Sequence, residues 1–249
     1  MSQTSKEISK EQRNNLFNKY LLIYSQGNDK RDELEIRFGT NYKNPITKIK
    51  FQNVIEKLKS LGFTISKNRH YLNINNEYTD PKTGSKKISN IRTEIYDTHN
   101  IKKYCNTNSL NLEKNKTMMK DVYFTQKFRK KNVDELLMPI DFKDFEFRVN
   151  YKTERRLDKY HPSIEKLLTT WNDEKKIFRL IKRLTFQHHE LPFNFDLSVV
   201  KTSTKSGPRL ISEYNIQASN VFNNPETFEV EVEVDNNRRY QFTNLGIDI

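Results

Sequence analysis

The chain has 249 residues, of which 34% are hydrophobic, and a formal net charge of +12 from 44 Lys and Arg against 32 Asp and Glu. This length fits one large β domain or two small ones. The basic balance is typical of a protein with a polyanionic partner, nucleic acid or polyphosphate, although richness in Lys and Asn can also reflect genomic base bias. The single cysteine, Cys105, excludes a disulfide framework and a cysteine zinc site within one chain.

Neither end nor middle of the sequence contains a membrane signal. The N-terminal segment is polar and lacks the apolar region of a signal peptide, and no apolar run approaches transmembrane length. We therefore expect a soluble protein in a reducing, intracellular compartment, with no membrane partner.

The first third of the chain predicts two helices on either side of a strand. An amphipathic helix is expected over 6–25, with Gly27 as a stop signal, and a second over 46–60, after Pro45. The expected inward residues of the second helix are Ile49, Val54, Ile55 and Leu58. Between the helices, the segment 33–39 alternates with period two. Leu34, Ile36 and Phe38 share one face, and Glu33, Glu35 and Arg37 share the other.

The rest of the chain reads mainly as strands. These are expected at 63–65, 70–78, 86–97, 121–130, 141–153, 176–187 and 192–203. A polar loop is expected over 105–120 and a short helix from Pro162, whereas 209–223 is ambiguous, with a short helix as one option. No internal repeat or linker divides the sequence, so we expect a single domain over 1–249.

The last predicted strand, 227–235, is the most regular. Its sequence TFEVEVEVD places Phe228 and three valines on one face, and only carboxylates on the other. Those carboxylates are Glu229, Glu231, Glu233 and Asp235. A row of like charges repels itself, and it is tolerable only if the face is fully solvated or holds a cation.

A sheet of many strands, each with one apolar and one charged face, can be arranged in two ways. The sheet can be open, with its charged face in water, or closed, with the apolar face outward under helices and the charged face lining a lumen. In a closed sheet the acidic strands from both ends of the sequence become neighbours, and their carboxylates could hold Mg²⁺ or Mn²⁺. Basic strands would then bind phosphate oxygens.

The paired acidic strands, ELEIRFG at 33–39 and FEVEVEV at 228–234, resemble the two glutamate motifs of the triphosphate tunnel metalloenzymes. Within that superfamily the chain is similar to the RNA triphosphatase module of mRNA-capping enzymes of the fungal and large-DNA-virus kind. Four basic strands match in order: Asn90–Arg92, Tyr123–Lys127, Arg148–Glu154 and Arg179–Phe186. The segment Phe195–Lys201 resembles the next family strand, and the whole match spans roughly 33–235. One departure is Ile181, which stands where the family pattern has an inward lysine.

This resemblance implies a β-dominated α+β fold: a closed eight-stranded antiparallel tunnel with a charged lumen, packed outside by a few helices. The N-terminal helix would lie within 1–30, and the tunnel with its inserted helices within 31–249. The resemblance also implies the site. The expected metal ligands are Glu33, Glu35 and Glu233. Glu229 and Glu231 are expected to hold the nucleophilic water or to orient basic side chains. The expected phosphate-binding residues are Arg92, Lys127, Arg148, Arg179 and Arg183, of which Arg179 and Arg183 are also catalytic, with Glu154 and Asp196 bracing them.

The implied activity is metal-dependent removal of the γ-phosphate of 5′-triphosphate RNA, the first step of mRNA capping, with Mg²⁺ or Mn²⁺ as cofactor. Guanylyltransferase and methyltransferase domains are the expected partners, on a parent chain or a separate protein. The compartment would be the cytoplasm, a viral factory or a virion if the protein is viral, and the nucleus if it is fungal-like. Two alternatives stay open: a tunnel phosphohydrolase of nucleoside triphosphate, tripolyphosphate or thiamine triphosphate, and a non-catalytic RNA-binding β module whose acidic faces are merely solvated.

Overall fold

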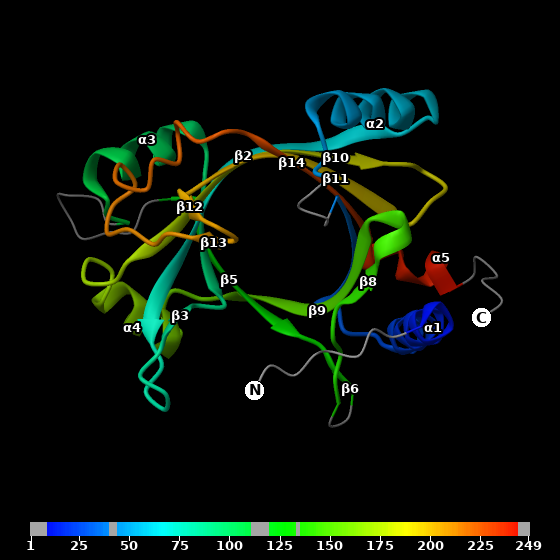
Figure 1. The fold of residues 1–249 in the computed structure, drawn as a ribbon, viewed down its shortest axis with the longest axis horizontal. Coiled ribbons are helices and arrows are strands. Elements are labelled where there is room, and N and C mark those ends of the chain that lie inside the picture. Colours follow the sequence, from blue (N-terminus) through cyan, green and yellow to red (C-terminus); the bar gives the residue numbers. More distant parts are fainter. Residues whose placement is uncertain (1–8, 40–43, 111–119, 133–134, 244–249) are drawn as a thin grey trace.

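A closed ring of antiparallel strands forms the centre of the molecule, in a computed structural model that describes residues 9–39, 44–110, 120–132 and 135–243 (Figure 1). The strands that form the ring are β1 (Asp32–Phe38), β2 (Thr64–Thr79), β4 (Ile91–Tyr96), β5 (Val122–Arg129), β9 (Phe147–Leu157), β10 (Lys176–Gln187), β11 (Phe193–Thr202) and β14 (Thr227–Val234). Their order around the ring is β1-β14-β11-β10-β2-β4-β5-β9, and pairing of β9 with β1 closes it. The predicted eight-stranded antiparallel tunnel is therefore confirmed.

Short strands extend the ring or form small hairpins beside it. β3 (Lys86–Ile88) pairs with β2, β8 (Ile140–Phe142) with β9, β6 (Lys131–Asn132) with β7 (Glu135–Leu136), and β12 (Lys205–Ser206) with β13 (Arg209–Leu210). The helices are α1 (Lys10–Gln26), α2 (Lys48–Ser60), α3 (Thr98–Thr107), α4 (Pro162–Thr169) and α5 (Arg239–Thr243), with 3₁₀ turns η1 (Lys143–Phe145) and η2 (Asn236–Arg238). None of the described helices is long and apolar enough to cross a membrane.

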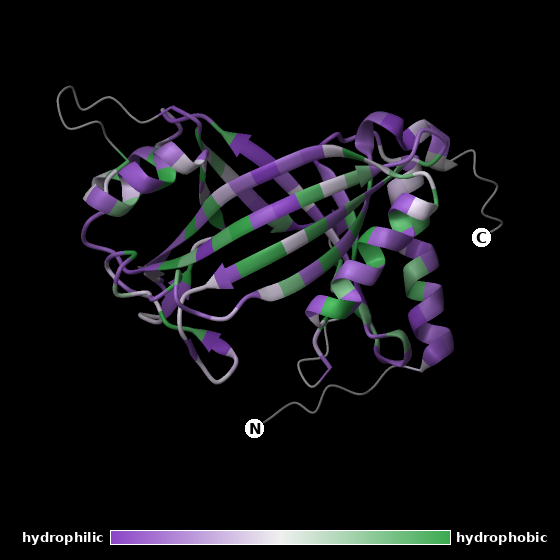
Figure 2. Ribbon diagram, turned by 90° about the horizontal axis from the view of Figure 1, so that it is seen from above, coloured by the Kyte–Doolittle hydropathy of each residue, from purple (hydrophilic) through white to green (hydrophobic). Residues whose placement is uncertain are grey.

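The hydrophobic core lies outside the ring, between the outer face of the strands and the helices. Tyr20 and Tyr24 of α1 pack with Leu34 and Val149, so α1 covers β1 and β9. The corresponding cluster under α2 contains Phe51, Leu58, Leu197 and Val230, and the one under α3 and α4 contains Tyr104, Ile164, Leu72 and Phe178. Figure 2 shows the resulting alternation of hydrophobic and hydrophilic residues along the strands. Burying the apolar faces under helices leaves the charged faces to line the inside.

Several local predictions need correction. Helix α2 buries Phe51 and leaves Ile49 70% exposed, because Phe51 lies on the same side of the helix as Leu58, whereas Ile49 lies on the opposite side. The start of the predicted polar loop at 105–120 is the end of α3, a helix that carries an apolar stripe of Ile101 and Tyr104; residues 111–119 lie outside the described part. The two strands predicted at 63–65 and 70–78 are one continuous strand, β2. The optional helix in 209–223 is instead β13 and a series of turns.

Candidate active site

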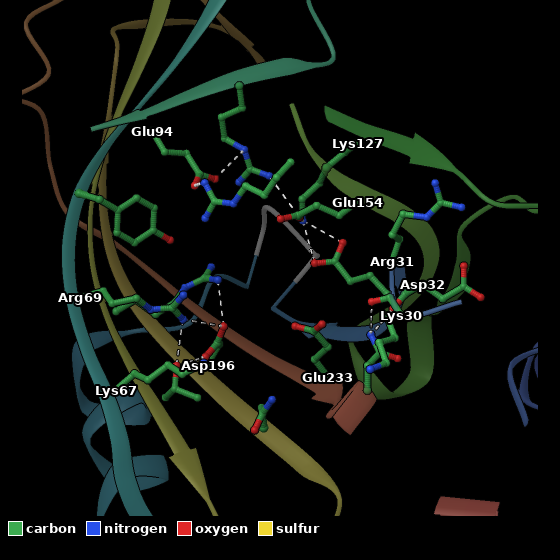
Figure 3. Close-up of a pocket in the computed structure, with 18 of the residues that line it drawn as sticks. Lys30, Arg31, Asp32, Lys67, Arg69, Glu94, Lys127, Glu154, Asp196 and Glu233 are labelled. Atoms are coloured by element: carbon green, nitrogen blue, oxygen red, sulfur yellow. Dashed lines mark hydrogen bonds and ion pairs between the residues drawn. The ribbon is translucent and has the colours of Figure 1, made fainter. Parts of the chain in front are cut away.

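Two cavities, of about 330 and about 320 Å³, follow each other through the lumen of the ring. They share the lining residues Glu33, Arg92, Lys127, Arg183 and Glu233, which therefore mark the middle of the tunnel. The first cavity continues outward along Lys30, Lys67 and Arg69, which are labelled in Figure 3, and along Tyr96 and Arg156. The second continues the other way along Glu35, Arg37, Lys152, Arg179, Glu229 and Glu231. Both acidic strands thus face one enclosed space, as the closed arrangement requires.

The three glutamates predicted as metal ligands come together where β1 pairs with β14. Glu35 is the register partner of Glu233, and Glu33 lies two residues away on the same face of β1. Glu33 accepts hydrogen bonds from Lys127 at 2.8 Å to each oxygen, and Glu35 accepts one from Lys152 at 2.5 Å. Within the described residues no cation bonds to the carboxylate of Glu233, and no dashed line reaches it in Figure 3.

The electrostatics of this group follow from its crowding. Burial and then the charge of Glu33 raise the pKa of Glu233 well above its ordinary value. Burial also raises the pKa of Glu33, and the attraction of Lys127 offsets this only in part. A carboxylate that resists ionisation beside others is a place where a cation would be stabilised.

The neighbouring wall of the tunnel, formed by β10, β11 and the first part of β14, is built from arginines held by acids. Arg183 donates to Asp196 and Glu231 at 2.9 Å each, and to the hydroxyl of Ser198 at 2.7 Å. Burial acts to raise the pKa of Glu231, but the charges of Arg183 and Arg37 outweigh it and hold the pKa below the ordinary value. Glu231 is therefore an ionised partner for arginines at neutral pH.

Glu229 lies on the same face of β14 as Glu231 and also accepts hydrogen bonds from arginines. Arg179 donates to both of its oxygens, at 2.8 and 2.9 Å, and Arg37 donates to one of them at 2.5 Å. Glu229 thus lies between two guanidinium groups and fixes the position of both. Of the two roles expected for Glu229 and Glu231, these contacts favour the orientation of basic side chains.

Lys127 and Arg92 complete the basic set on the side of β4 and β5. Lys127 bonds to Glu154 at 2.7 Å as well as to Glu33, and Arg92 lies 3.7 Å from Glu154 and 3.6 Å from Glu94. Glu154 and Asp196 both touch predicted phosphate-binding residues, as bracing residues would. Burial acts to lower the pKa of Lys127, but the charges of Glu33 and Glu154 outweigh it, so this amine stays protonated.

One predicted phosphate ligand lies elsewhere. Arg148 lines neither cavity, because its guanidinium forms a two-point hydrogen bond with Asp141 of β8, at 2.6 and 2.9 Å, at the edge of the ring. The alternation places Arg148 on the correct face, but the short strand β8 captures its side chain. We therefore remove Arg148 from the phosphate-binding set.

The lumen also contains residues that the sequence analysis did not select. Arg37, Arg69 and Lys152 line the cavities, and so does Asn73, whose buried amide finds no hydrogen-bond partner among the described residues for either polar atom. The period-two alternation that selected Arg92 would have found all four, had it been applied to β2 and to every inward position of β1 and β9. Ile181 does face the lumen, where it packs with Tyr71 and Val200 instead of supplying a cation.

Comparison with solved structures supports the fold. The Mimivirus capping enzyme triphosphatase superposes with a TM-score of 0.58 and 16% sequence identity, over 96% of this chain and 96% of that chain. The S. pombe Pct1 RNA triphosphatase gives a TM-score of 0.47 and 14% identity, over 98% of this chain and 88% of that one, a similarity too weak to add to the argument. No protein-family model and no curated protein sequence matches the chain. The predicted resemblance is thus confirmed at the level of the fold: the chain has the closed tunnel fold of the Mimivirus triphosphatase.

Proposed function

We propose that this protein is a divalent-metal-dependent RNA 5′-triphosphatase, which removes the γ-phosphate of 5′-triphosphate RNA before cap addition. The observation that carries the proposal is the arrangement in the middle of the tunnel. Three carboxylates from β1 and β14 face Arg92, Lys127 and Arg183 across one enclosed space. An enclosed space lined by both carboxylates and cations suits a polyphosphate with its metal ion.

The carboxylate group fits a hard divalent cation. Glu33, Glu35 and Glu233 offer only oxygen donors, which Mg²⁺ and Mn²⁺ prefer, and burial and then the charge of Glu33 raise the pKa of Glu233. In the described part of the chain no three His, Cys, Asp or Glu side chains are already arranged to hold a metal ion. Lys127 and Lys152 bond Glu33 and Glu35, two of the three carboxylates. When bound, the metal would neutralise charge on the phosphate and polarise its phosphorus–oxygen bonds.

The basic side chains would bind and orient the phosphate chain. Arg183 and Arg179 are held by Glu231 and Glu229 with their guanidinium groups in the lumen, so little reorganisation is needed when phosphate arrives. Such prearranged donors stabilise the charge that spreads over the equatorial oxygens as water attacks the γ-phosphorus in line. The products would be 5′-diphosphate RNA and phosphate.

The runner-up is hydrolysis of small triphosphates by the same lumen. Its middle recognises phosphate and metal, which nucleoside triphosphate, tripolyphosphate and thiamine triphosphate share with RNA. The non-catalytic alternative fits less well, because the acidic faces line an enclosed lumen and are not solvated outer surfaces.

The test is release of γ-labelled phosphate from triphosphate RNA with Mg²⁺, with Mn²⁺ and with chelator, using free nucleotide and tripolyphosphate as competitors. We expect metal-dependent release that Glu35→Ala abolishes. Glu56→Gln, which removes a glutamate charge from the outer surface of α2, is the matched control and should behave as wild type. Phosphate release that persists in chelator, or in Glu35→Ala, would contradict the proposal.

A further inference from the structure

The two cavities of the lumen differ in their aromatic residues. Tyr71 and Tyr96 line the first cavity, whereas the described residues that line the second include no aromatic side chain. Both cavities hold arginines and carboxylates, so charge alone does not distinguish the two ends of the tunnel. The aromatic rings do, and they lie on the side that opens past Lys67, Arg69 and Arg156.

The rings form a continuous row from the lumen wall outward. Tyr71 stacks on Tyr96, with ring centres 4.9 Å apart and planes 21° apart, and Tyr96 meets Tyr123 edge to face at 5.6 Å. The guanidinium of Arg156 lies over the ring of Tyr123 at 4.6 Å. Exposure grows along the row: Tyr71 is 4% exposed and Tyr123 is 42% exposed, and the side chain of Arg156 is 53% exposed. The outer end of the row is thus a planar surface open to solvent.

This row is not part of the main core. The three large hydrophobic clusters lie on the outer face of the ring, under the helices. Tyr71 and Tyr96 belong to a fourth, small cluster with Ile181 and Val200, which is on the lumen face. Packing of the outer core therefore does not account for these rings.

Cations connect the row to the middle of the tunnel. Lys67 and Arg69 lie on the same face of β2 as Tyr71, and within the described residues no carboxylate pairs with the amine of Lys67. Arg92 and Arg183, at the join of the two cavities, lie farther in. A molecule with a planar aromatic group at one end and a chain of phosphates at the other matches this sequence of contacts.

We propose that the 5′-terminal nucleoside of the substrate binds at the mouth of the first cavity, with its base stacked on the surface formed by Tyr123 and Arg156 and its phosphates directed inward. This inference rests on the proposed function and deepens it, because it fixes the end of the tunnel that RNA enters. Every base has a π face, so a stacking surface tolerates any base, and cation–π contact with arginine adds to it.

The chain provides a matched control for this pair. Arg155 lies over the ring of Phe128 at 5.4 Å, on the same two strands as Arg156 and Tyr123. Phe128 lies an odd number of positions from Tyr123 on β5, and Arg155 lies an odd number from Arg156 on β9. Phe128 and Arg155 therefore lie on the outer face of the ring, away from the lumen. Phe128→Ala therefore removes an equivalent arginine–aromatic contact without touching the proposed subsite.

Binding is measured with triphosphate RNA that carries 2-aminopurine, a base whose fluorescence falls when it stacks, at its first or its sixth nucleotide. With wild type we expect quenching of the first-position probe and none at the sixth. The quenching should be lost in Tyr123→Ala and kept in Tyr123→Trp and Phe128→Ala. Quenching that is equal in wild type and Tyr123→Ala would overturn the proposal, whether or not the protein hydrolyses RNA.

Kinetics give an independent measure. Tyr123→Ala should raise the KM for triphosphate RNA relative to the KM for tripolyphosphate by about five- to hundredfold, the range that loss of one stacked base gives. Phe128→Ala should leave that ratio as in wild type. Active wild type with an unchanged ratio in Tyr123→Ala would refute the subsite alone. First-position quenching without phosphate release would instead refute the triphosphatase function and leave the subsite standing.

Discussion

The two ends of β14 hold the same residue in opposite situations. At one end Glu229 and Glu231 each accept hydrogen bonds from arginines, whereas at the other end Glu233 has no cationic partner within the described residues and lies opposite Glu35. All three side chains point to the same side of the same strand. The difference arises from the neighbouring strands, because β10 offers Arg179 and Arg183 to the first two, and β1 offers more carboxylates to the third.

This contrast separates two uses of a buried carboxylate. A glutamate paired with arginine is already neutralised, and its value lies in holding the guanidinium in place. A glutamate among glutamates is costly to ionise and gains most from an added cation. One acidic strand can therefore serve the phosphate wall at one end and a metal site at the other.

The sharpest test of the contrast compares Glu233→Gln with Glu229→Gln. Glu233→Gln should lower kcat by about a thousandfold or more, since metal ions supply several kcal/mol of charge stabilisation, and it should remove most of the rise in Tm that Mn²⁺ gives wild type. Glu229→Gln should also slow hydrolysis but keep the metal-dependent rise in Tm. If both variants keep that rise, Glu233 is not a metal ligand. If both variants lose the metal-dependent rise in Tm, the assignment of Glu233 to the metal site and of Glu229 to the phosphate wall is wrong.

A somewhat smaller effect is expected at the phosphate wall. Arg183→Ala should reduce kcat/KM by about 30- to 1000-fold, the effect of losing one prearranged charged donor, and Arg183→Lys should recover only part of it because the fork geometry is lost. The metal-dependent rise in Tm should persist. Arg148→Ala is the matched control: its ion pair with Asp141 is partly exposed and lies outside both cavities, so activity should stay within about threefold of wild type. Equal losses in Arg183→Ala and Arg148→Ala would contradict the assignment of the wall.

The smallest effect concerns stability without metal. The folded-state pKa of Glu233 is raised above the unfolded value, so the folded state binds more protons, and stability falls as the pH rises from about 4.5 through the raised pKa. In chelator, Glu233→Gln should therefore raise Tm at about pH 8, by roughly 2–4 °C, and raise it less at about pH 5. Glu229→Gln should lower Tm, because it removes the negative charge that Arg37 and Arg179 both pair with. A Tm gain for Glu233→Gln that is the same at both pH values would show that repulsion is not the cause.

Period-two alternation predicted much of the architecture. It assigned the faces of β1, β10, β11 and β14 and so predicted the lumen, because a strand has only two faces and the apolar one must be covered. It could not predict α3, since a short polar helix with two buried residues, Ile101 and Tyr104, has the composition of a loop. The family resemblance, and not the alternation, selected an eight-stranded ring from the open and closed solutions.

The site was predicted less completely, for a related reason. Alternation gives the side to which a residue points but not which neighbour will bind it. Arg148 has the correct face yet is captured by Asp141, and Glu233 differs from Glu229 only through side chains on other strands. Arg156 and Tyr123 depend on a contact between β5 and β9 that no local pattern contains. Such partnerships depend on strand order and register, which follow from long-range pairing.

The pairing of Glu35 with Glu233 also has a consequence for how the protein folds. The two residues are separated by most of the chain, so the contact between β1 and β14 is among those with the highest cost in loop-closure entropy. Two nearby contacts stabilise the pairing of β1 with β14: Asn236 donates to the backbone of Asp32, and Arg239 lies 3.8 Å from the Asp32 carboxylate. A nascent chain cannot pair β1 with β14 until β14 has left the ribosome, whereas hairpins such as that between β10 and β11 can form earlier. The protein would therefore become able to bind a triphosphate only at the end of folding, in the step that closes the ring.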